Sequence, residues 1–379
     1  MRLKSIEYSE YKGQENEWTL DKLSLGAVNL VVGKNASGKT RILNVVRNTA
    51  RGLTRGKPFE NGDTLLVFDD NGTEIRYETK IVQGHVQTET FTVDEALRLD
   101  RSTDGKGEIY AEVEDRLVAF QTPDEQLAAV SRRDNVQHPF FEPLHDWANS
   151  LYYYSFGTHF GKNQVAVFVD QPKGRASEFD AKDPDQLASI FRKGKIDFPD
   201  KFTPEIIRDF GLVGYRITEV GLGAPPEMVL AVPGQVAAVY VREADLSTNT
   251  FQTTMSQGMF RALSIIVQVN YAVLAGSPSC IIIDDIGEGL DFDRSRRLIE
   301  VLIARAKESN VQLIMATNDR YVMNHIPLQH WSVVDRKGGQ VRIRNAENSK
   351  ELFESFSHTG LSNFDFLAFD YINSGTPDE

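Results

Sequence analysis

The stretch that decides the fold is the octapeptide Gly33-Lys34-Asn35-Ala36-Ser37-Gly38-Lys39-Thr40. It matches the pattern G-x-x-x-x-G-K-[ST], in which glycines let successive backbone N–H groups turn inward around phosphate groups. In this pattern Lys39 reaches the β- and γ-phosphates of a nucleotide, and the hydroxyl of Thr40 binds Mg²⁺. The octapeptide and the next residue, Arg41, therefore predict a binding site for ATP and Mg²⁺.

The residues on either side of this loop are typical of a strand and a helix. Residues 27–32 form an apolar run that ends at Gly33, which indicates a buried strand. A helix is expected to begin near Thr40 and to point its positive N-terminal end at the anion. The apolar positions of this helix have helical spacing: Ile42, Leu43, Val45 and Val46. The alternative, a glycine-rich turn with a surface lysine, does not account for these flanking patterns.

Two adjacent acids end a second apolar strand, in the stretch Ile281-Ile282-Ile283-Asp284-Asp285. Carboxylates at the end of a buried strand are costly unless they face a cation or a polar site. Asp284 is therefore the candidate for a direct or indirect role at Mg²⁺, and Asp285 for polarising the attacking water. Glu288 is either a turn acid or a reserve catalytic carboxylate. The alternative for the pair is that both acids cap the next helix from a loop.

The rest of the chain shows a change of pattern from strand-rich to alternating. Strands are predicted near the N-terminus over residues 2–8, 64–69 and 73–82. The last two are expected to form a hairpin around the turn Asp70-Asn71-Gly72. The middle is predicted to be helical over 124–152, with Pro139 and Pro143 breaking the pattern, exposed over 170–204 and strand-like over 213–242. Helix and strand then alternate over 258–275, 279–284, 293–308 and 311–317. This last alternation predicts a parallel sheet covered by helices.

Composition excludes several classes of protein. The formal net charge of the 379 residues is −12, which argues against broad, charge-driven DNA binding but not against a local basic groove. No run approaches about 18 consecutive apolar residues, so no membrane span is expected. The single cysteine, Cys280, is expected to be a small buried hydrophobe of a cytoplasmic protein. The seven histidines show no metal-binding spacing.

Together these motifs resemble the ABC-type ATPases. The resemblance is to the soluble clade of overcoming-lysogenization-defect (OLD) nucleases, RecF-type repair proteins and phage-defence ATPases. Three further stretches carry it. The signature loop of the family is resembled by Met255-Ser256-Gln257-Gly258-Met259-Phe260-Arg261. The Walker B acids and the D-loop that follows them are resembled by Asp284-Asp285-Ile286-Gly287-Glu288-Gly289-Leu290-Asp291. The switch is resembled by Ala316-Thr317-Asn318-Asp319.

The resemblance implies a site that two chains share. In such ATPases the signature serine and glycine, here Ser256 and Gly258, contact the ATP bound by the other protomer. A homodimer or higher oligomer with ATP at its interface is therefore expected. Asp285 stands where a catalytic Glu is usual, and Asn318 stands where His is common, so slow turnover is expected. The catalytic candidates are Asp285, Glu288 and Asn318.

The fold implied is α/β, an ABC-type ATPase head with a strand-rich N-terminal lobe, a helical or mixed insertion and a parallel-sheet core. The whole chain is expected to form one domain. Its parts are the strand-rich lobe 61–120, the insertion 121–250, and the signature, Walker B and switch region 251–379. The sequence does not single out the residue that stacks on adenine, for which the candidates are Tyr8, Tyr11 and Trp18. It does not single out the glutamine of the Q-loop either, for which the candidates are Gln83, Gln87 and Gln121.

The expected function is ATP binding and slow hydrolysis to ADP and phosphate, with closure of the dimer controlling an effector in phage defence. OLD proteins carry a C-terminal nuclease, and the roughly sixty residues after Asp319 are too few for one. The effector is therefore expected to be a separate protein. Two alternatives stay open: a RecF-like DNA-repair ATPase that binds nucleic acid, and a nucleotide-gated scaffold with little turnover. A long-armed chromosome-maintenance protein and a transporter ATPase are disfavoured.

Overall fold

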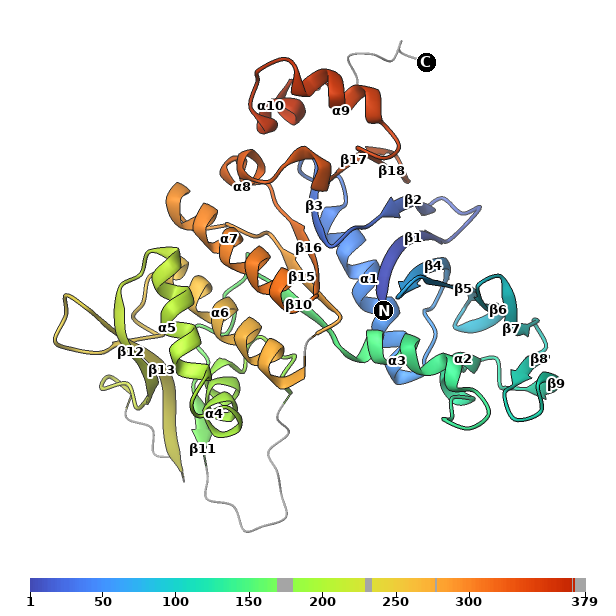
Figure 1. Ribbon diagram of the computed structural model, residues 1–379, viewed down its shortest axis with the longest axis horizontal. Coiled ribbons are helices and arrows are strands. Elements are labelled where there is room, and N and C mark those ends of the chain that lie inside the picture. The colour runs from blue at the N-terminus through green and yellow to red at the C-terminus, as the bar shows by residue number, and fades with distance from the viewer. Residues whose placement is uncertain (169–179, 229–233, 277, 370, 372–379) are drawn as a thin grey trace.

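The computed structural model describes residues 1–168, 180–228, 234–276, 278–369 and 371. Its centre is an α/β fold around a sheet of fourteen strands, in the order β10-β15-β16-β3-β17-β18-β2-β1-β4-β5-β6-β7-β8-β9. One half of this sheet is parallel and the other is largely antiparallel (Figure 1). The predicted fold class is confirmed.

The parallel half carries the motifs found in the sequence. Its strands are β10 (Leu151–Ser155), β15 (Cys280–Asp284), β16 (Gln312–Ala316), β3 (Val28–Val32) and β17 (Trp331–Lys337). Strands β3, β15 and β16 are buried along their whole length, as parallel strands covered on both faces must be. Their side chains alternate between two cores: Ile282 faces one, and Ile281 and Ile283 face the other.

Helices cover both faces of these strands (Figure 1). One face packs on α1 (Lys39–Arg55), α2 (Ala128–Ser131) and α3 (Glu142–Asn149). The other packs on α4 (Leu187–Asp197), α5 (Phe202–Val213), α6 (Gln257–Gly276), α7 (Phe292–Glu308) and α8 (Arg320–His325). Helix α6 is long and apolar enough to cross a membrane, but 83% of its most apolar window is buried within the protein. It is the central helix of its core.

The other half of the sheet forms the lobe at the right of Figure 1. Its strands are β18 (Gln340–Asn345), β2 (Trp18–Ser24), β1 (Arg2–Glu10), β4 (Gly62–Asp70), β5 (Thr73–Val82), β6 (His85–Val93), β7 (Ala96–Arg101), β8 (Lys106–Ala111) and β9 (Arg116–Gln121). The predicted hairpin is confirmed, because Asn71 and Gly72 adopt φ values of 55° and 97° between β4 and β5.

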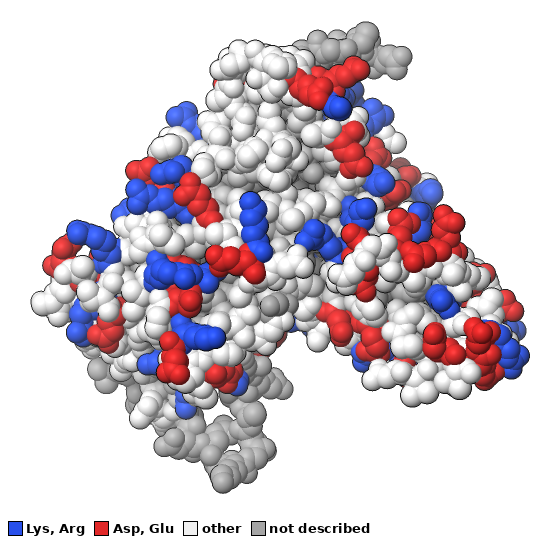
Figure 2. All heavy atoms as spheres, in the orientation of Figure 1, with Lys and Arg blue, Asp and Glu red and all other residues white. Residues whose placement is uncertain are grey.

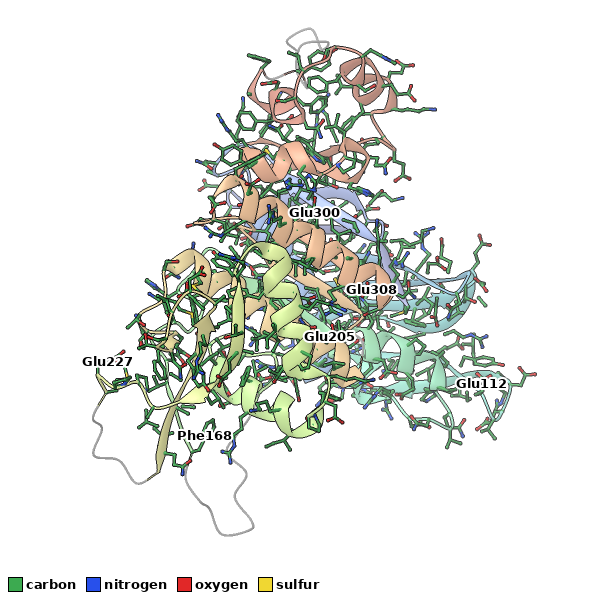
Figure 3. The ribbon with its side chains drawn as sticks, turned by 60° about the vertical axis from the view of Figure 1, so that its left-hand side comes forward. Glu112, Phe168, Glu205, Glu227, Glu300 and Glu308 are labelled. Atoms are coloured by element: carbon green, nitrogen blue, oxygen red, sulfur yellow. The ribbon has the colours of Figure 1, made fainter. Side chains whose placement is uncertain are left out.

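A smaller sheet and two terminal helices complete the described fold. The sheet contains β11 (Ala166–Phe168), β12 (Ile217–Gly223), β13 (Gln235–Glu243) and β14 (Thr250–Phe251). The terminal helices are α9 (Lys350–Ser357) and α10 (Asn363–Ala368), and short 3₁₀ turns occur at Pro139–Phe141 and Leu328–His330. Figure 3 shows the face of α5 and α7, where Arg305 of α7 forms ion pairs with Glu205 and Asp209 of α5.

Two expectations for the middle of the chain were wrong in part. The helical pattern over 124–152 is broken at Pro139 and Pro143, as predicted. Its end was wrong, because Leu151 and Tyr152 begin β10, which pairs with β15. The stretch 170–204, expected to be exposed, contains α4 and the start of α5, with Ile190 and Phe191 buried. The charged residues of α4 are exposed on its outer side. Residues 170–179 lie outside the described part. The strands predicted within residues 213–242 are confirmed by β12 and β13. Residues 229–233 of this range also lie outside the described part of the chain.

A buried ion pair fixes α2 to the strand-rich lobe. Glu89 on β6 and Arg101 on β7 are 0% and 1% exposed, and their Oε2 and Nη1 atoms are 3.2 Å apart. The Glu89 carboxylate also accepts hydrogen bonds from the Tyr77 hydroxyl and from the backbone N–H groups of Ala128 and Ala129. Every partner of this buried anion is therefore supplied by the protein itself.

Removing the anion should destabilise the lobe strongly. Glu89→Ala leaves the buried charge of Arg101 without its counterion and two N–H groups without an acceptor, so we expect a loss of about 3–5 kcal/mol in the free energy of unfolding, measured with urea. The control is Glu78→Ala on β5, an exposed carboxylate, for which we expect a change within about 0.5 kcal/mol. Equal losses in the two variants would show that the pair contributes nothing specific.

Candidate functional site

The predicted phosphate loop connects β3 to α1 and has the backbone shape that binds anions. Ala36 and Gly38 have φ values of 62° and 106°, so left- and right-handed residues alternate and successive N–H groups turn to one side. Gly38 precedes α1 without a side-chain cap, which leaves the first N–H groups of the helix for a ligand. Gly33 is required by space: a Cβ there would lie 2.7 Å from Ser37 Oγ and 2.9 Å from the Val334 carbonyl oxygen.

The Lys39 side chain is buried inside its own loop. Its Nζ donates hydrogen bonds to the carbonyl oxygens of Gly33 and Lys34, at 2.9 and 3.2 Å. Burial lowers the pKa of this ammonium group, and the charges of Asp285 and then Asp284 act in the opposite direction. A phosphate group would replace the two carbonyl acceptors with charged ones.

Asp284 has the surroundings of a cation ligand. Its side chain is 5% exposed, its Oδ1 has no hydrogen-bond partner, and its Oδ2 accepts from the Tyr153 hydroxyl at 3.4 Å. Burial raises the pKa of this carboxyl, whereas a hydrogen bond from Thr40 lowers it. An unpartnered carboxylate oxygen beside a threonine hydroxyl suits Mg²⁺, which takes oxygen ligands and shares them with substrate phosphates. These two residues fit the metal predicted from the sequence.

Asp285 and Glu288 line the same wall of the site. A Cβ at Gly157 would lie 3.1 Å from Asp285 Oδ2 and 2.6 Å from Glu288 Oε2, so both carboxylates approach this glycine. Asp285 has a positive φ of 55°, which is uncommon for a residue with a side chain. The Glu288 carboxylate is more exposed and lies 3.8 Å from Arg261. Glu288 therefore lies nearer the surface than Asp285.

The signature residues begin α6 and are held by their own chain. Ser256 is exposed, and its hydroxyl accepts a hydrogen bond from the Met259 N–H at 3.2 Å. Gly258 lies directly on the D-loop, because a Cβ there would be 2.4 Å from the Gly289 carbonyl oxygen. The N-terminal end of α6 is thus fixed against residues that follow the Walker B strand.

The predicted switch residue follows β16, next to the Walker B strand. Thr317 Oγ1 donates to the Ile286 carbonyl at 2.8 Å, and Asp319 caps α8 by accepting from two backbone N–H groups. Asn318 between them is exposed, and its amide makes no hydrogen bond to the described parts of the chain. The carboxyl ends of β3, β15 and β16 lie at one edge of the parallel sheet, which brings Asn318 to the edge that carries Lys39 and Asp284.

The open candidates for the adenine and Q-loop roles can now be placed. Tyr8 and Trp18 are core residues, whereas Tyr11 is half-buried and lines a cavity of about 440 Å³ with Arg41 and Asn44. The Arg41 guanidinium lies 4.3 Å from the Trp18 ring centroid and pairs with Glu10. The Q-loop candidates all lie in the strand-rich lobe and stay open: Gln83, Gln87 and Gln121.

Three residues of the site were missed by the sequence analysis. Tyr153 contacts Asp284 from β10, and Arg336 Nη1 of β17 donates to the Ala36 carbonyl at 3.2 Å. Arg261 donates to the carbonyl oxygens of Gly157, Thr158 and Glu288, at 2.7, 3.1 and 2.9 Å. Only Arg261 had a signal in the sequence, as the last residue of the signature stretch.

Comparisons with known proteins agree with this geometry. A family model described as "AAA domain, putative AbiEii toxin, Type IV TA system" matches residues 28–324. A search of curated proteins finds no match.

Solved structures of similar fold are heads of SMC proteins. One, an SMC head bound to the C-terminal winged-helix domain of ScpA, has a TM-score of 0.51 and 13% identity over 93% of this chain and 100% of that one. A Pyrococcus furiosus SMC head with an extended coiled coil, bound to the C-terminal domain of ScpA, has a TM-score of 0.49 and 12% identity over 94% and 99%. The Thermotoga maritima SMC head has a TM-score of 0.46 and 14% identity over 91% and 99%. The first of these similarities shows the fold alone.

Proposed function

Because the chain belongs to this family of AAA domains and is a P-loop ATPase of the ABC type, we propose that two copies close on two ATP molecules and thereby control a partner protein. The observation that carries the proposal is the position of Ser256. Its hydroxyl is exposed at the start of α6, and Gly258 and Arg261 hold this helix end against the D-loop of the same chain. The helix end is therefore presented outward, where a second protomer's nucleotide can meet it.

In the proposed dimer, the residues around each ATP would have different roles in hydrolysis. Lys39 and the N–H groups of the phosphate loop bind the phosphates, and Thr40 and Asp284 hold Mg²⁺, which neutralises charge on them. Asp285 orients the attacking water and accepts its proton, and Asn318 donates a hydrogen bond to the γ-phosphate. Ser256 and Gly258 of the second protomer complete the phosphate cradle.

Slow turnover is part of the proposal. The Asp285 side chain is one methylene shorter than the glutamate usual in this position, and the Asn318 amide carries no charge at neutral pH. The closed dimer would therefore persist between binding and hydrolysis. The same two residues support the second candidate function, a nucleotide-gated scaffold with little turnover.

The partner is proposed to be a separate cytoplasmic effector protein. One SMC head of similar fold was solved bound to a winged-helix domain of ScpA, so a head of this kind can present a docking surface to another chain. The match to a model described as a putative toxin of type IV toxin–antitoxin systems favours a role in phage defence. Figure 2 shows acidic and basic side chains interspersed on the face it presents, which does not favour the RecF-like alternative there.

Blocking the signature should separate ATP binding from closure. In Ser256→Arg, a bulky arginine side chain occupies the space proposed for the γ-phosphate of the ATP bound by the other protomer. The phosphate loop of the protomer that carries the substitution is unchanged. We expect unchanged ATP affinity by calorimetry and no ATP-dependent rise in mass by light scattering. The control is Ser131→Arg at the exposed end of α2, which should close normally. Normal ATP-driven closure of Ser256→Arg would contradict the proposed interface.

A further inference from the structure

A second cluster of cations lies further along the helix that follows the phosphate loop. Arg47, Arg51 and Arg55 are four residues apart on α1, so they lie on one face of the helix with about 6 Å between successive positions along its axis. They line a cavity of about 380 Å³, which Lys182 and Tyr153 also line. We call this cavity the arginine pocket.

Two of the cations of this pocket lack the hydrogen-bond and ion-pair partners that arginines usually have. Neither Arg51 nor Arg55 forms a side-chain hydrogen bond or an ion pair with the described residues, and both are exposed. Burial, and then the like charges of Arg55 and Arg47, lower the pKa of the Arg51 guanidinium. Burial likewise lowers the pKa of Lys182. Like charges crowded at one cavity are stabilised by a bound anion.

The other residues that line the arginine pocket, and its volume, indicate which class of ligand could bind there. Asp180 and Asp183 face the same cavity, so its wall offers carboxylate acceptors beside the four cations. Its volume is at the lower end of the range for small-molecule sites and is too small for a folded partner. Arginines at successive turns of one helix can each pair with one of two linked phosphates, and the acids suit hydroxyl donors of a sugar.

The pocket is connected to the predicted Mg²⁺ ligand by two contacts. The Arg47 guanidinium lies 4.5 Å from the centroid of the Tyr153 ring, and the Tyr153 hydroxyl lies 3.4 Å from Asp284 Oδ2. Tyr153 is buried, so its ring has little freedom to move independently of these neighbours. A change at Arg47 is therefore transmitted over a single side chain to the acid beside Thr40.

We propose that the arginine pocket binds a small phosphorylated ligand, of the class of a nucleoside diphosphate, as a regulatory site separate from the phosphate loop. Its linked phosphates pair with Arg51 and Arg55 and draw the Arg47 guanidinium toward them. The bound anion offsets the positive charge of Arg47 beside Tyr153, so the Asp284 carboxylate attracts Mg²⁺ more strongly. Occupation of the pocket thereby tightens binding of Mg²⁺–ATP.

Binding at the pocket can be tested with inorganic pyrophosphate as the probe. The protein is first saturated with Mg²⁺ and a non-hydrolysable ATP analogue, so that the phosphate loop is filled, and pyrophosphate is then titrated by calorimetry with Mg²⁺ in excess. We expect one further binding event in the wild type. In the double variant Arg51→Gln/Arg55→Gln the affinity should fall by at least about tenfold, because two charge-assisted pairs are lost. The matched control is Arg76→Gln/Arg116→Gln, two exposed arginines of the strand-rich lobe, which should bind as the wild type does.

Two outcomes of this titration would overturn the proposal. One is the absence of a second event, or an equal loss in the control variant. The other is tighter binding of a hexathymidylate without terminal phosphates than of pyrophosphate, which would assign the pocket to a nucleic-acid backbone. Thermal melts of each variant show whether it is folded. This titration does not depend on dimer closure, so its failure is distinguishable from failure of the proposed function.

The connection to Asp284 has its own test. In the wild type, pyrophosphate should tighten binding of the Mg²⁺–ATP analogue about fivefold, and the analogue should tighten pyrophosphate by the same factor. Tyr153→Phe keeps the ring under Arg47 but removes the hydroxyl, so it should bind pyrophosphate normally and lose this coupling. Coupling that persists in Tyr153→Phe would exclude transmission through the tyrosine.

Discussion

Asp285→Asn should hydrolyse ATP on the order of 10²-fold more slowly than the wild type while binding ATP with unchanged affinity. The substitution keeps the size of the side chain and one oxygen but removes the negative charge that polarises water. Asp285 directly follows the Walker B strand, and of the two acids there its charge has the larger effect on the pKa of Lys39. Rapid-quench measurement of a single turnover gives the rate, and light scattering should show that the closed dimer accumulates.

The neighbouring acid provides the comparison for this variant. Glu288 approaches the same Gly157 but is exposed and lies 3.8 Å from Arg261, so Glu288→Gln should turn over at close to the wild-type rate. If Glu288→Gln were the slow variant and Asp285→Asn normal, the catalytic carboxylate would be Glu288. If neither changed a rate that is already negligible in the wild type, the nucleotide-gated scaffold would be the better account.

Lys39→Ala should lose ATP binding by more than tenfold, with the fold retained. The ammonium group is the charge that the loop brings to the β- and γ-phosphates, and no other described residue occupies its position between Gly33 and Asp285. Calorimetry with ATP and Mg²⁺ measures the affinity, and circular dichroism checks the fold. Removing a buried cation that has only carbonyl partners should cost little stability.

A conservative variant provides the control for this experiment. Lys39→Met keeps most of the length and the apolar stem of the side chain but removes its charge, so it should fail to bind ATP in the same way. Wild-type affinity in either folded variant would contradict the assignment of the phosphate loop.

The parts of the site that the sequence predicts are those encoded by adjacent residues. The loop around Lys39 and the strand before Asp284 combine local spacing with an apolar strand, and the structure brings them to one sheet edge as parallel strands must. The same is true of the hairpin at Asn71, whose turn residues carry their own conformational preference.

The residues that the sequence could not predict act across long separations. Arg261 binds carbonyl groups more than a hundred residues earlier in the chain, and Arg336 reaches Ala36 from three hundred residues later. Such contacts use backbone oxygens, which leave no pattern in the sequence of the partner. Tyr153 was missed for another reason: the stretch predicted to be helical, 124–152, includes the first two residues of its strand, so β10 was not recognised.

The uninterrupted sheet from β10 to β9 restricts where this protein can bend. Sliding one strand past the next would break several backbone hydrogen bonds at once, at about 1 kcal/mol each, whereas packed helices can shift through small side-chain adjustments. The binding energy of one nucleotide is therefore best able to move α4–α7 and the small sheet against a rigid base. In hydrogen exchange, the amides of β3, β15 and β16 should accordingly keep the same protection with and without ATP, while those of the helical layer change.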